Sequence, residues 1–159
     1  MKLSAEELLN KFSKSSSHPL EVRRISMMIF DEASEKIREM SNKERKYLEA
    51  AALLHDIGYY IDSKGHNKHS MRMVIENGIS GFDEREEKIT GCICRYHRGG
   101  LPDKNDHEVY NTLEKKDRKM VKRLAGILKI ADGLDRGHLN LIKKIHLSYD
   151  EENNITEFI

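Results

Sequence analysis

Tryptophan is absent from this sequence of 159 residues, proline and cysteine each occur twice, and aromatic residues make up 6% of it. Scarce proline beside abundant Leu, Ile, Lys and Glu favours helix over sheet. No apolar run approaches the roughly 20 residues that cross a bilayer as a helix, and the first residues lack the apolar segment of a signal peptide. We therefore expect a cytoplasmic, all-helical protein without a membrane partner.

A strong charge of either sign is also missing, because the formal net charge is only +1. No global field therefore points to a nucleic-acid partner. The two cysteines, Cys92 and Cys94, stand two positions apart in an expected helix, where their side chains diverge and a disulfide is geometrically poor. We expect them to be reduced, half-buried packing residues in a chain whose length fits one domain.

Caps and apolar periodicity divide the chain into helices. Ser4 with Glu7 forms a capping-box pattern, and Asp83 with Glu86 repeats it. We expect a short first helix after Ser4 and then helices over residues 19–40, 43–56, 69–77, 83–97 and 117–136. The polar, glycine-containing stretch over residues 59–68 is predicted to be a loop.

The last residues have a different pattern. Residues 144–149 alternate like a strand, DEENN is typical of a turn, and ITEFI forms a possible return strand. We predict a helical metal-binding domain over residues 1–143 and a β-like tail over 144–159. Because a lone two-stranded ribbon is marginal in water, the tail is either a short hairpin or a truncated sheet.

Histidines and aspartates occupy the ends of apolar helix faces. Over residues 43–56 the apolar face ends in the adjacent pair His55 and Asp56. Three other polar residues lie in line with the apolar face of a helix in the same way: His18, immediately before its helix, His97 and Asp132. A buried, uncompensated carboxylate is costly, so these groups are expected to share a cation. Imidazole and carboxylate ligands suit one or two divalent transition metal ions, with Mn, Fe, Co, Ni and Zn all admissible.

The other histidines are less defined by the pattern. His69 is either a ligand or an exposed first-turn residue, and His66, three positions earlier, is able to face the same site. His107, His138 and His146 stand in polar or strand-like contexts and are expected to be solvated. A separate zinc site at Cys94 and His97 is disfavoured, because a structural zinc site normally has four ligands.

The order His18, His55-Asp56, Asp132 resembles the H…HD…D arrangement of the HD phosphohydrolase superfamily. GYYIDSKGHNKHS at 58–70, RYHRGGLP at 95–102 and ILKIADGLDR at 127–136 resemble the C-terminal helical domain of the exopolyphosphatase and guanosine pentaphosphate phosphatase family, over roughly residues 18–149. The resemblance implies an HD-domain helical bundle. It also implies a first metal site, at His18, His55, Asp56 and Asp132, and a second ion supported by His69 and His97 and bridged by Asp56.

Two departures from that family limit what the resemblance implies. In full-length members the phosphatase chemistry belongs to an actin-like pair of N-terminal domains that this sequence lacks, so polyphosphatase activity is not carried over. Many members have lost HD residues from the helical domain, whereas the set here is complete, which favours a free-standing hydrolase. Members of the family also continue beyond the residues present here, in keeping with a truncated C-terminal sheet.

The expected function is metal-dependent hydrolysis of a phosphate ester or anhydride in a nucleotide or another small phosphorylated compound. Asp56 is the expected catalytic ligand, and His66 a general acid for the leaving group. Positive side chains near the ligands suit phosphate oxygens, unless they are ordinary solvated charges: Lys64, Lys68, Arg95, Arg98 and Arg136, and also Arg23. Arg98 is the preferred phosphate clamp.

Two other classes of function stay open at this point. In the first, a non-catalytic regulatory module binds a nucleotide or polyphosphate without turnover. In the second, a metal serves only to staple a dimerisation domain, with a closed coordination sphere. A homodimer through the segment around Met27 and Met28 is plausible, unless these methionines are core residues.

Overall fold

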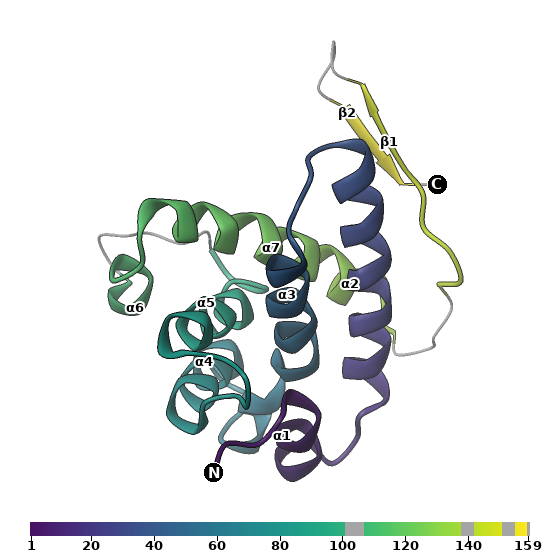
Figure 1. Cartoon of the computed structure of the whole chain (residues 1–159). Coiled ribbons are helices and arrows are strands. Elements are labelled where there is room, and N and C mark those ends of the chain that lie inside the picture. Colours follow the sequence, from purple (N-terminus) through teal and green to yellow (C-terminus); the bar gives the residue numbers. More distant parts are fainter. Residues whose placement is uncertain (101–106, 138–141, 151–154, 159) are drawn as a thin grey trace.

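The chain is described by a computed structural model that covers residues 1–100, 107–137, 142–150 and 155–158. It is predominantly helical, as predicted, with a two-stranded hairpin after the helices (Figure 1). The helices are α1 Ala5–Phe12, α2 Ser17–Lys36, α3 Asn42–Leu54, the 3-10 helix η1 Ile57–Tyr60, α4 His66–Asn77, α5 Glu84–Arg95, α6 Glu108–Asn111 and α7 Lys115–Leu134. None of the helices in these ranges is both long and apolar enough to cross a membrane.

Three helices begin with a complete capping box. Ser4, Ser41 and Asp83 each accept a hydrogen bond from the backbone N–H three residues on, and the glutamate there bonds back to the cap. This reciprocal pairing satisfies backbone donors that a helix start otherwise leaves open. The capping boxes predicted at Ser4 and Asp83 are therefore confirmed.

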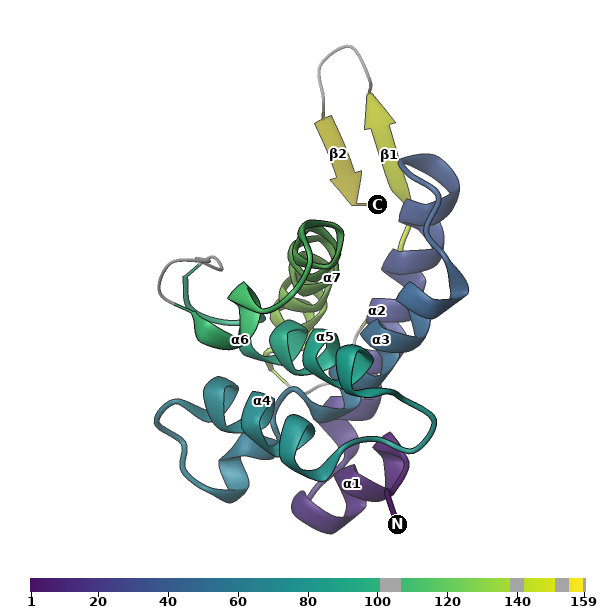
Figure 2. The same cartoon turned by 60° about the vertical axis from the view of Figure 1, so that its left-hand side comes forward.

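Helix α3 lies at the centre of the helical body and packs against α1, α2, α5 and α7. Figure 2 shows this helix crossing behind α5 and beside α2. Tyr47, Leu48 and Leu54 are almost fully buried on it, and a run of three alanines, Ala50 to Ala52, lets its neighbours approach closely. The carboxyl end of α3 is therefore inside the protein, so the residues that follow it begin in the core.

The cysteines and the methionines of α2 are packing residues. Cys92 and Cys94 are free, as predicted, but fully buried rather than half-buried, and burial raises the pKa of Cys92 to about 12. Met27 is buried and Met28 packs against the core. Their positions are those of core side chains, and a dimer through this segment stays a prediction.

The predicted loop over residues 59–68 is partly helical. It contains the last residues of η1 and the first turn of α4, which begins at His66 rather than at His69. Gly65, immediately before α4, has a φ of 70°. That left-handed conformation is readily available to glycine, and it lets the chain turn directly into the helix.

The tail forms a hairpin in which β1 (Leu147–Asp150) pairs antiparallel with β2 (Ile155–Phe158). Strand β1 packs on α2, where Leu147 is buried and its backbone N–H donates to Glu32 Oε2 at 3.1 Å. This contact supports a ribbon that would be marginal on its own. The division of the chain at residue 143 stays a prediction.

Candidate metal centre

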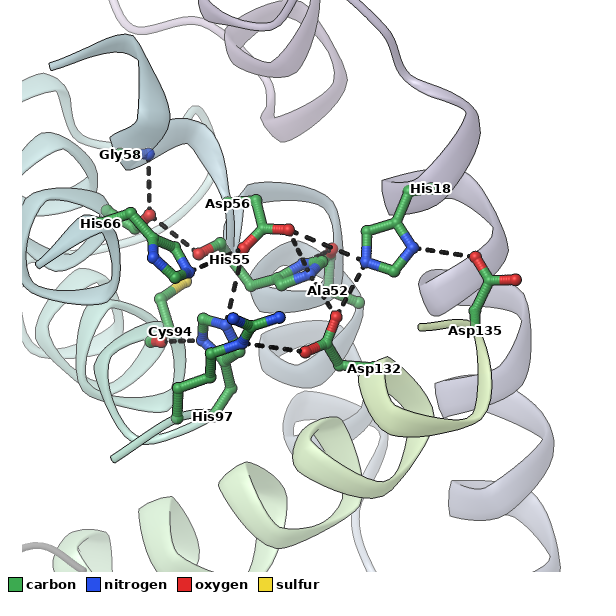
Figure 3. Close-up of polar contacts among 12 residues, drawn as sticks. His18, Ala52, His55, Asp56, Gly58, His66, Cys94, His97, Asp132 and Asp135 are labelled. Atoms are coloured by element: carbon green, nitrogen blue, oxygen red, sulfur yellow. Dashed lines mark hydrogen bonds and ion pairs between the residues drawn. The ribbon is translucent and has the colours of Figure 1, made fainter. Parts of the chain in front are cut away.

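The ends of helices from both halves of the chain converge on one buried cluster of imidazoles and carboxylates (Figure 3). Helix α2 contributes a residue of its first turn, α4 its first residue and α7 a residue of its last turn, while the ends of α3 and α5 are followed by the others. The cluster is His18, His55, Asp56, His66, His97 and Asp132.

The first group of potential ligands is the set expected from the sequence: His18, His55, Asp56 and Asp132, with one atom from each lying within 4.8 Å of the others. His18 Nε2 is 2.8 Å from Asp132 Oδ1. His55 Nε2 is 3.2 Å from Asp56 Oδ2 and 3.3 Å from Asp132 Oδ1. Two imidazoles and two carboxylates therefore face a common point.

The second group consists of Asp56, His66 and His97. His66 Nε2 is 3.2 Å from Asp56 Oδ1, and His97 Nε2 is 3.6 Å from the same oxygen. Asp56 thus belongs to both groups, presenting Oδ2 to His55 and Oδ1 to His66 and His97. A carboxylate in this position is able to bridge two neighbouring cations.

The cluster contains buried polar atoms that lack hydrogen-bond partners. In the described part of the chain six buried side-chain nitrogen or oxygen atoms have none, and four of them are His55 Nε2, Asp56 Oδ1, His66 Nε2 and His97 Nε2. Buried polar groups in native proteins are normally paired. Four buried atoms without a hydrogen-bond partner in one cluster fit one or two cations, whose ligand bonds would satisfy them.

The imidazoles of His55 and His97 are oriented by backbone carbonyls. His55 Nδ1 is 2.6 Å from the carbonyl oxygen of Ala52, and His97 Nδ1 bonds to that of Cys94. When such a ring is neutral and Nδ1–H is the donor, Nε2 directs its lone pair at the cluster. Hydrogen bonding of the remote ring nitrogen is the usual way in which proteins orient a metal-binding histidine.

The sequence analysis did not single out Asp135. Its Oδ2 lies 2.8 Å from His18 Nδ1, on the side of the ring away from Asp132. Asp135 is only 3% exposed. A signal for it was present, because residues three apart on a helix share a face and Asp135 follows Asp132 by that spacing.

The charges of the cluster favour an added cation. Burial opposes ionisation of Asp56, but the surrounding imidazoles, His55 foremost, hold its pKa well below the usual range. Burial also opposes ionisation of Asp132, but His18 and then His55 hold its pKa well below the usual range. For His55 itself, burial opposes protonation, yet Asp132 and Asp56 raise its pKa to about 10. Both carboxylates are therefore ionised at neutral pH, and a cation that binds His55 releases a proton.

His66, not His69, reaches the cluster. As the first residue of α4, His66 stacks on Tyr59, with ring centroids 4.2 Å apart and an interplanar angle of 13°. This packing turns Nε2 toward Asp56. His69, nearly one turn further along α4, is half-buried and belongs to neither group of ligand atoms found among the described residues.

A close backbone contact holds α4 against η1. Gly58 N donates to Ser70 Oγ at 2.8 Å, and that hydroxyl donates to the carbonyl oxygen of His55 at 2.8 Å. A Cβ at Gly58 would lie 1.9 Å from the carbonyl oxygen of His66, so only glycine fits. The start of α4, and with it His66, is thereby fixed relative to Asp56.

The predicted phosphate-binding residues differ in their relation to the cluster. Arg98 contacts it, with Nε 3.4 Å from Asp132 Oδ2 and a side chain that is 47% exposed. The guanidinium of Arg95 lies 5.3 Å from the ring centroid of Tyr96, and that of Arg23 pairs with Glu6. The remaining ones are exposed: Lys64, Lys68 and Arg136.

The histidines expected to be solvated need one correction. His107 is half-buried, and its Nδ1 lies 2.6 Å from the hydroxyl of Tyr96, whose ring stacks on the imidazole. The sequence around it is polar and gave no sign of this partner. His146 is partly exposed and lies 3.7 Å from Glu32, and His138 lies outside the described residues.

The sulfur of Cys94 donates to the carbonyl oxygen of Ala51, which does not favour a zinc site with His97.

A cavity of about 810 Å³ opens onto the cluster at His18 and Asp56. Its other walls come from the end of α1, the segment between α1 and α2, and η1. Sequence analysis missed the wall residues between α1 and α2, because that segment is short, polar and without a motif. The buried cluster is thus connected to the surface.

The fold and this site together define an all-helical domain with a central cluster of imidazoles and carboxylates beside an open cavity. The chain belongs to the family described as Ppx/GppA phosphatase, domain III, whose match covers residues 2–158. It is also similar to the guanosine-5'-triphosphate,3'-diphosphate pyrophosphatase of Aeromonas hydrophila subsp. hydrophila, with 27% identity over 131 residues. That alignment covers 80% of this chain and 25% of the relative, so the chain spans about a quarter of the relative's length. The family predicted by resemblance is confirmed, and membership of the HD superfamily stays a prediction.

Proposed function

We propose that this chain is an HD-type, metal-dependent phosphohydrolase that acts on a phosphate ester or anhydride of a nucleotide or another small phosphorylated compound. The observation that carries the proposal is the set of four unpaired buried atoms, from His55, Asp56, His66 and His97, in one cluster. Membership of a phosphatase family supports the same class of reaction.

The two groups of side chains would hold two ions. The first would be bound by His18, His55, Asp56 and Asp132, and the second by Asp56, His66 and His97. Nitrogen and oxygen ligands in this mixture suit Mn, Fe, Co, Ni or Zn. His66 takes the place that the sequence analysis gave to His69, and a ligated His66 no longer has Nε2 free to act as a general acid.

A divalent cation in such a centre supplies an activated water and withdraws charge from a phosphoryl oxygen. The protein's own groups position that chemistry. Ionised Asp56 holds the two groups together, and Arg98, half-exposed beside Asp132, adds positive charge where a phosphate would approach. The cavity that reaches His18 and Asp56 gives a substrate its route to the cluster.

A second candidate is a regulatory module that binds a nucleotide or polyphosphate without turnover. The observation that favours it is that the matched family model is domain III of the phosphatase family, whereas in full-length members the phosphatase chemistry belongs to the N-terminal pair of domains. Such a module would keep the metal and the ligand affinity but release no product.

The test is metal analysis by mass spectrometry together with phosphate release, comparing wild type with Asp56→Asn. After reconstitution with Mn, Fe, Co, Ni or Zn, the wild type should retain stoichiometric metal and release phosphate from at least one of a panel of nucleotides and phosphate esters. Asp56→Asn should lose both while its circular dichroism is unchanged, and Asp62→Asn, at an exposed position, should lose neither.

The possible results separate the proposals. A wild type that remains metal-free after reconstitution with every one of these ions rejects the hydrolase. Stoichiometric metal without any product favours the regulatory module instead.

A further inference from the structure

The cavity beside the cluster has an aromatic wall. Tyr59 and Tyr60 of η1 are 49% and 65% exposed, and both line the cavity together with Phe12 of α1. The rings of Phe12 and Tyr60 meet edge to face, with centroids 5.0 Å apart at 70°. Large aromatic side chains gathered at the rim of a polar site offer a surface for a flat, apolar part of a ligand.

Tyr59 connects this wall with the cluster. Its ring stacks on His66, while the residue as a whole is 49% exposed. A ligand resting on the aromatic wall would therefore lie next to the second group of potential metal ligands.

The same cavity has a positive rim. Lys11 and Lys14 are exposed and line it, and Lys11 Nζ lies 5.2 Å from the centroid of the Phe12 ring. Of the described residues that line the cavity, Asp56 is the one carboxylate, and it faces the cluster. The rim therefore attracts anions, and its lysines suit phosphate groups that do not react.

We propose that this cavity binds a nucleotide carrying at least two phosphate groups. The base would lie on Tyr59 and Tyr60, one phosphate would pair with Lys11 and Lys14, and another would reach the cluster. The position of the reacting phosphate rests on the proposed function, whereas the base and lysine contacts do not.

The cavity's size and chemistry favour a nucleotide over a chain of inorganic phosphates. Its volume of about 810 Å³ falls within the roughly 300–1,000 Å³ typical of small-molecule sites. An inorganic polyanion has no apolar face to cover Tyr60 and Phe12, whereas any of the nucleobases is able to stack on aromatic rings. A ligand that has both a base and phosphate groups contacts both the aromatic wall and the positive rim.

The experiment is isothermal titration calorimetry of the full chain reconstituted with metal. ADP, GDP and UDP are the probes, and pyrophosphate and tripolyphosphate are the probes without a base. At least one nucleoside diphosphate should bind about tenfold more tightly than pyrophosphate, which is the effect expected from stacking one base.

Two pairs of variants test the contributions of the aromatic wall and of the positive rim separately. Tyr60→Ala should abolish the difference between the nucleotide and pyrophosphate, while Ile61→Ala, the 58% exposed neighbour outside the cavity, should preserve it. The double variant Lys11→Ala/Lys14→Ala should weaken nucleotide and pyrophosphate alike, and Lys116→Ala, at the start of α7, should weaken neither.

Binding and phosphate release are measured in separate experiments. If the chain releases no phosphate but shows the preference that depends on Tyr60, the proposed hydrolase fails and the nucleotide site stands. If pyrophosphate or tripolyphosphate binds as tightly as every nucleotide, or if no probe binds, the nucleotide site is overturned even when other phosphate esters are hydrolysed.

Discussion

His18 and Asp135 are joined inside the protein by a contact of 2.8 Å between Nδ1 and Oδ2. The other ring nitrogen of His18 is directed at Asp132, also at 2.8 Å. Burial lowers the pKa of His18, but the hydrogen bonds to Asp132 and Asp135 outweigh it and raise that pKa. Asp135 is therefore a positioning residue, which acts on the cluster through the imidazole.

Replacing Asp135 should weaken metal binding without unfolding the protein. In Asp135→Asn an amide oxygen still accepts from Nδ1, but the charge that makes Nε2 more basic is lost. Affinity for the metal should fall by about 10- to 100-fold, the usual effect of removing such a partner. Competition with a chromogenic chelator measures it, and Asp62→Asn is the control. Equal affinities in Asp135→Asn and wild type would contradict this role.

Single alanine variants should separate the two groups of ligands. His66→Ala and His97→Ala each remove one of three potential ligands of the second group and none of the first. Both should retain one ion where the wild type retains two, by metal analysis after desalting. His69→Ala is the matched control on α4 and should retain both. The opposite pattern, with loss in His69→Ala and not in His66→Ala, would restore the assignment made from the sequence.

A salt bridge between α5 and α7 should contribute to stability. Arg85 donates to Asp117 at 2.9 and 2.6 Å, and Asp117 is 1% exposed. Arg85→Ala leaves that carboxylate buried without its partner, which should lower the free energy of unfolding by about 1–3 kcal/mol. Urea denaturation measures the change. Lys88→Ala, whose ammonium pairs with exposed Glu84, should change it by less than about 0.5 kcal/mol, and equal effects would contradict the prediction.

The buried Tyr47 should make stability depend on alkaline pH. Its hydroxyl donates to Glu86, and burial together with this carboxylate raises its pKa from 10.0 to about 12. The folded pKa is above the unfolded one, so the contribution is fully present below pH 10 and is lost as pH rises toward 12.

The test compares Tyr47→Phe with wild type across that range of pH. The variant loses the hydrogen bond, so at neutral pH it should be less stable by about 0.5–2 kcal/mol. Its deficit should shrink between pH 10 and about 12, because only the wild type carries the titrating hydroxyl. Parallel curves for the two proteins, from chemical denaturation at each pH, would show that Tyr47 does not titrate in this way.

Much of the site was predictable because local spacing determines which helix face is buried. His55 and Asp56 extend the apolar face of α3, and the buried position of that helix carries His55 into the core and leaves Asp56 partly exposed beside it. The same reasoning brought His18, His97 and Asp132 to one place, which the structure shows them sharing.

The parts that were missed depend on contacts between distant segments. Whether His66 or His69 faces Asp56 is decided by where α4 begins, and that depends on the turn at Gly65 and on packing against η1. Residues 59–68 have no apolar period from which to read this. Lys11 and Lys14 line the cavity because α1 packs beside η1. The polar sequence around these two lysines does not predict that packing.

The backbone contact at Gly58 fixes how closely α4 packs against η1. A methyl group there would meet the backbone of α4 at 1.9 Å from the carbonyl oxygen of His66 and 2.6 Å from Ser70 N, and no rotamer relieves either collision. It would push the start of α4, and with it His66, away from η1. His18 and Asp132 would not move with His66, because they lie on α2 and α7. The backbone contact at Gly58 thus helps to set the distance between the first and second groups of potential ligands. Because Gly58 has a hydrogen atom where other residues have Cβ, His66 of the second group stays close to Asp56.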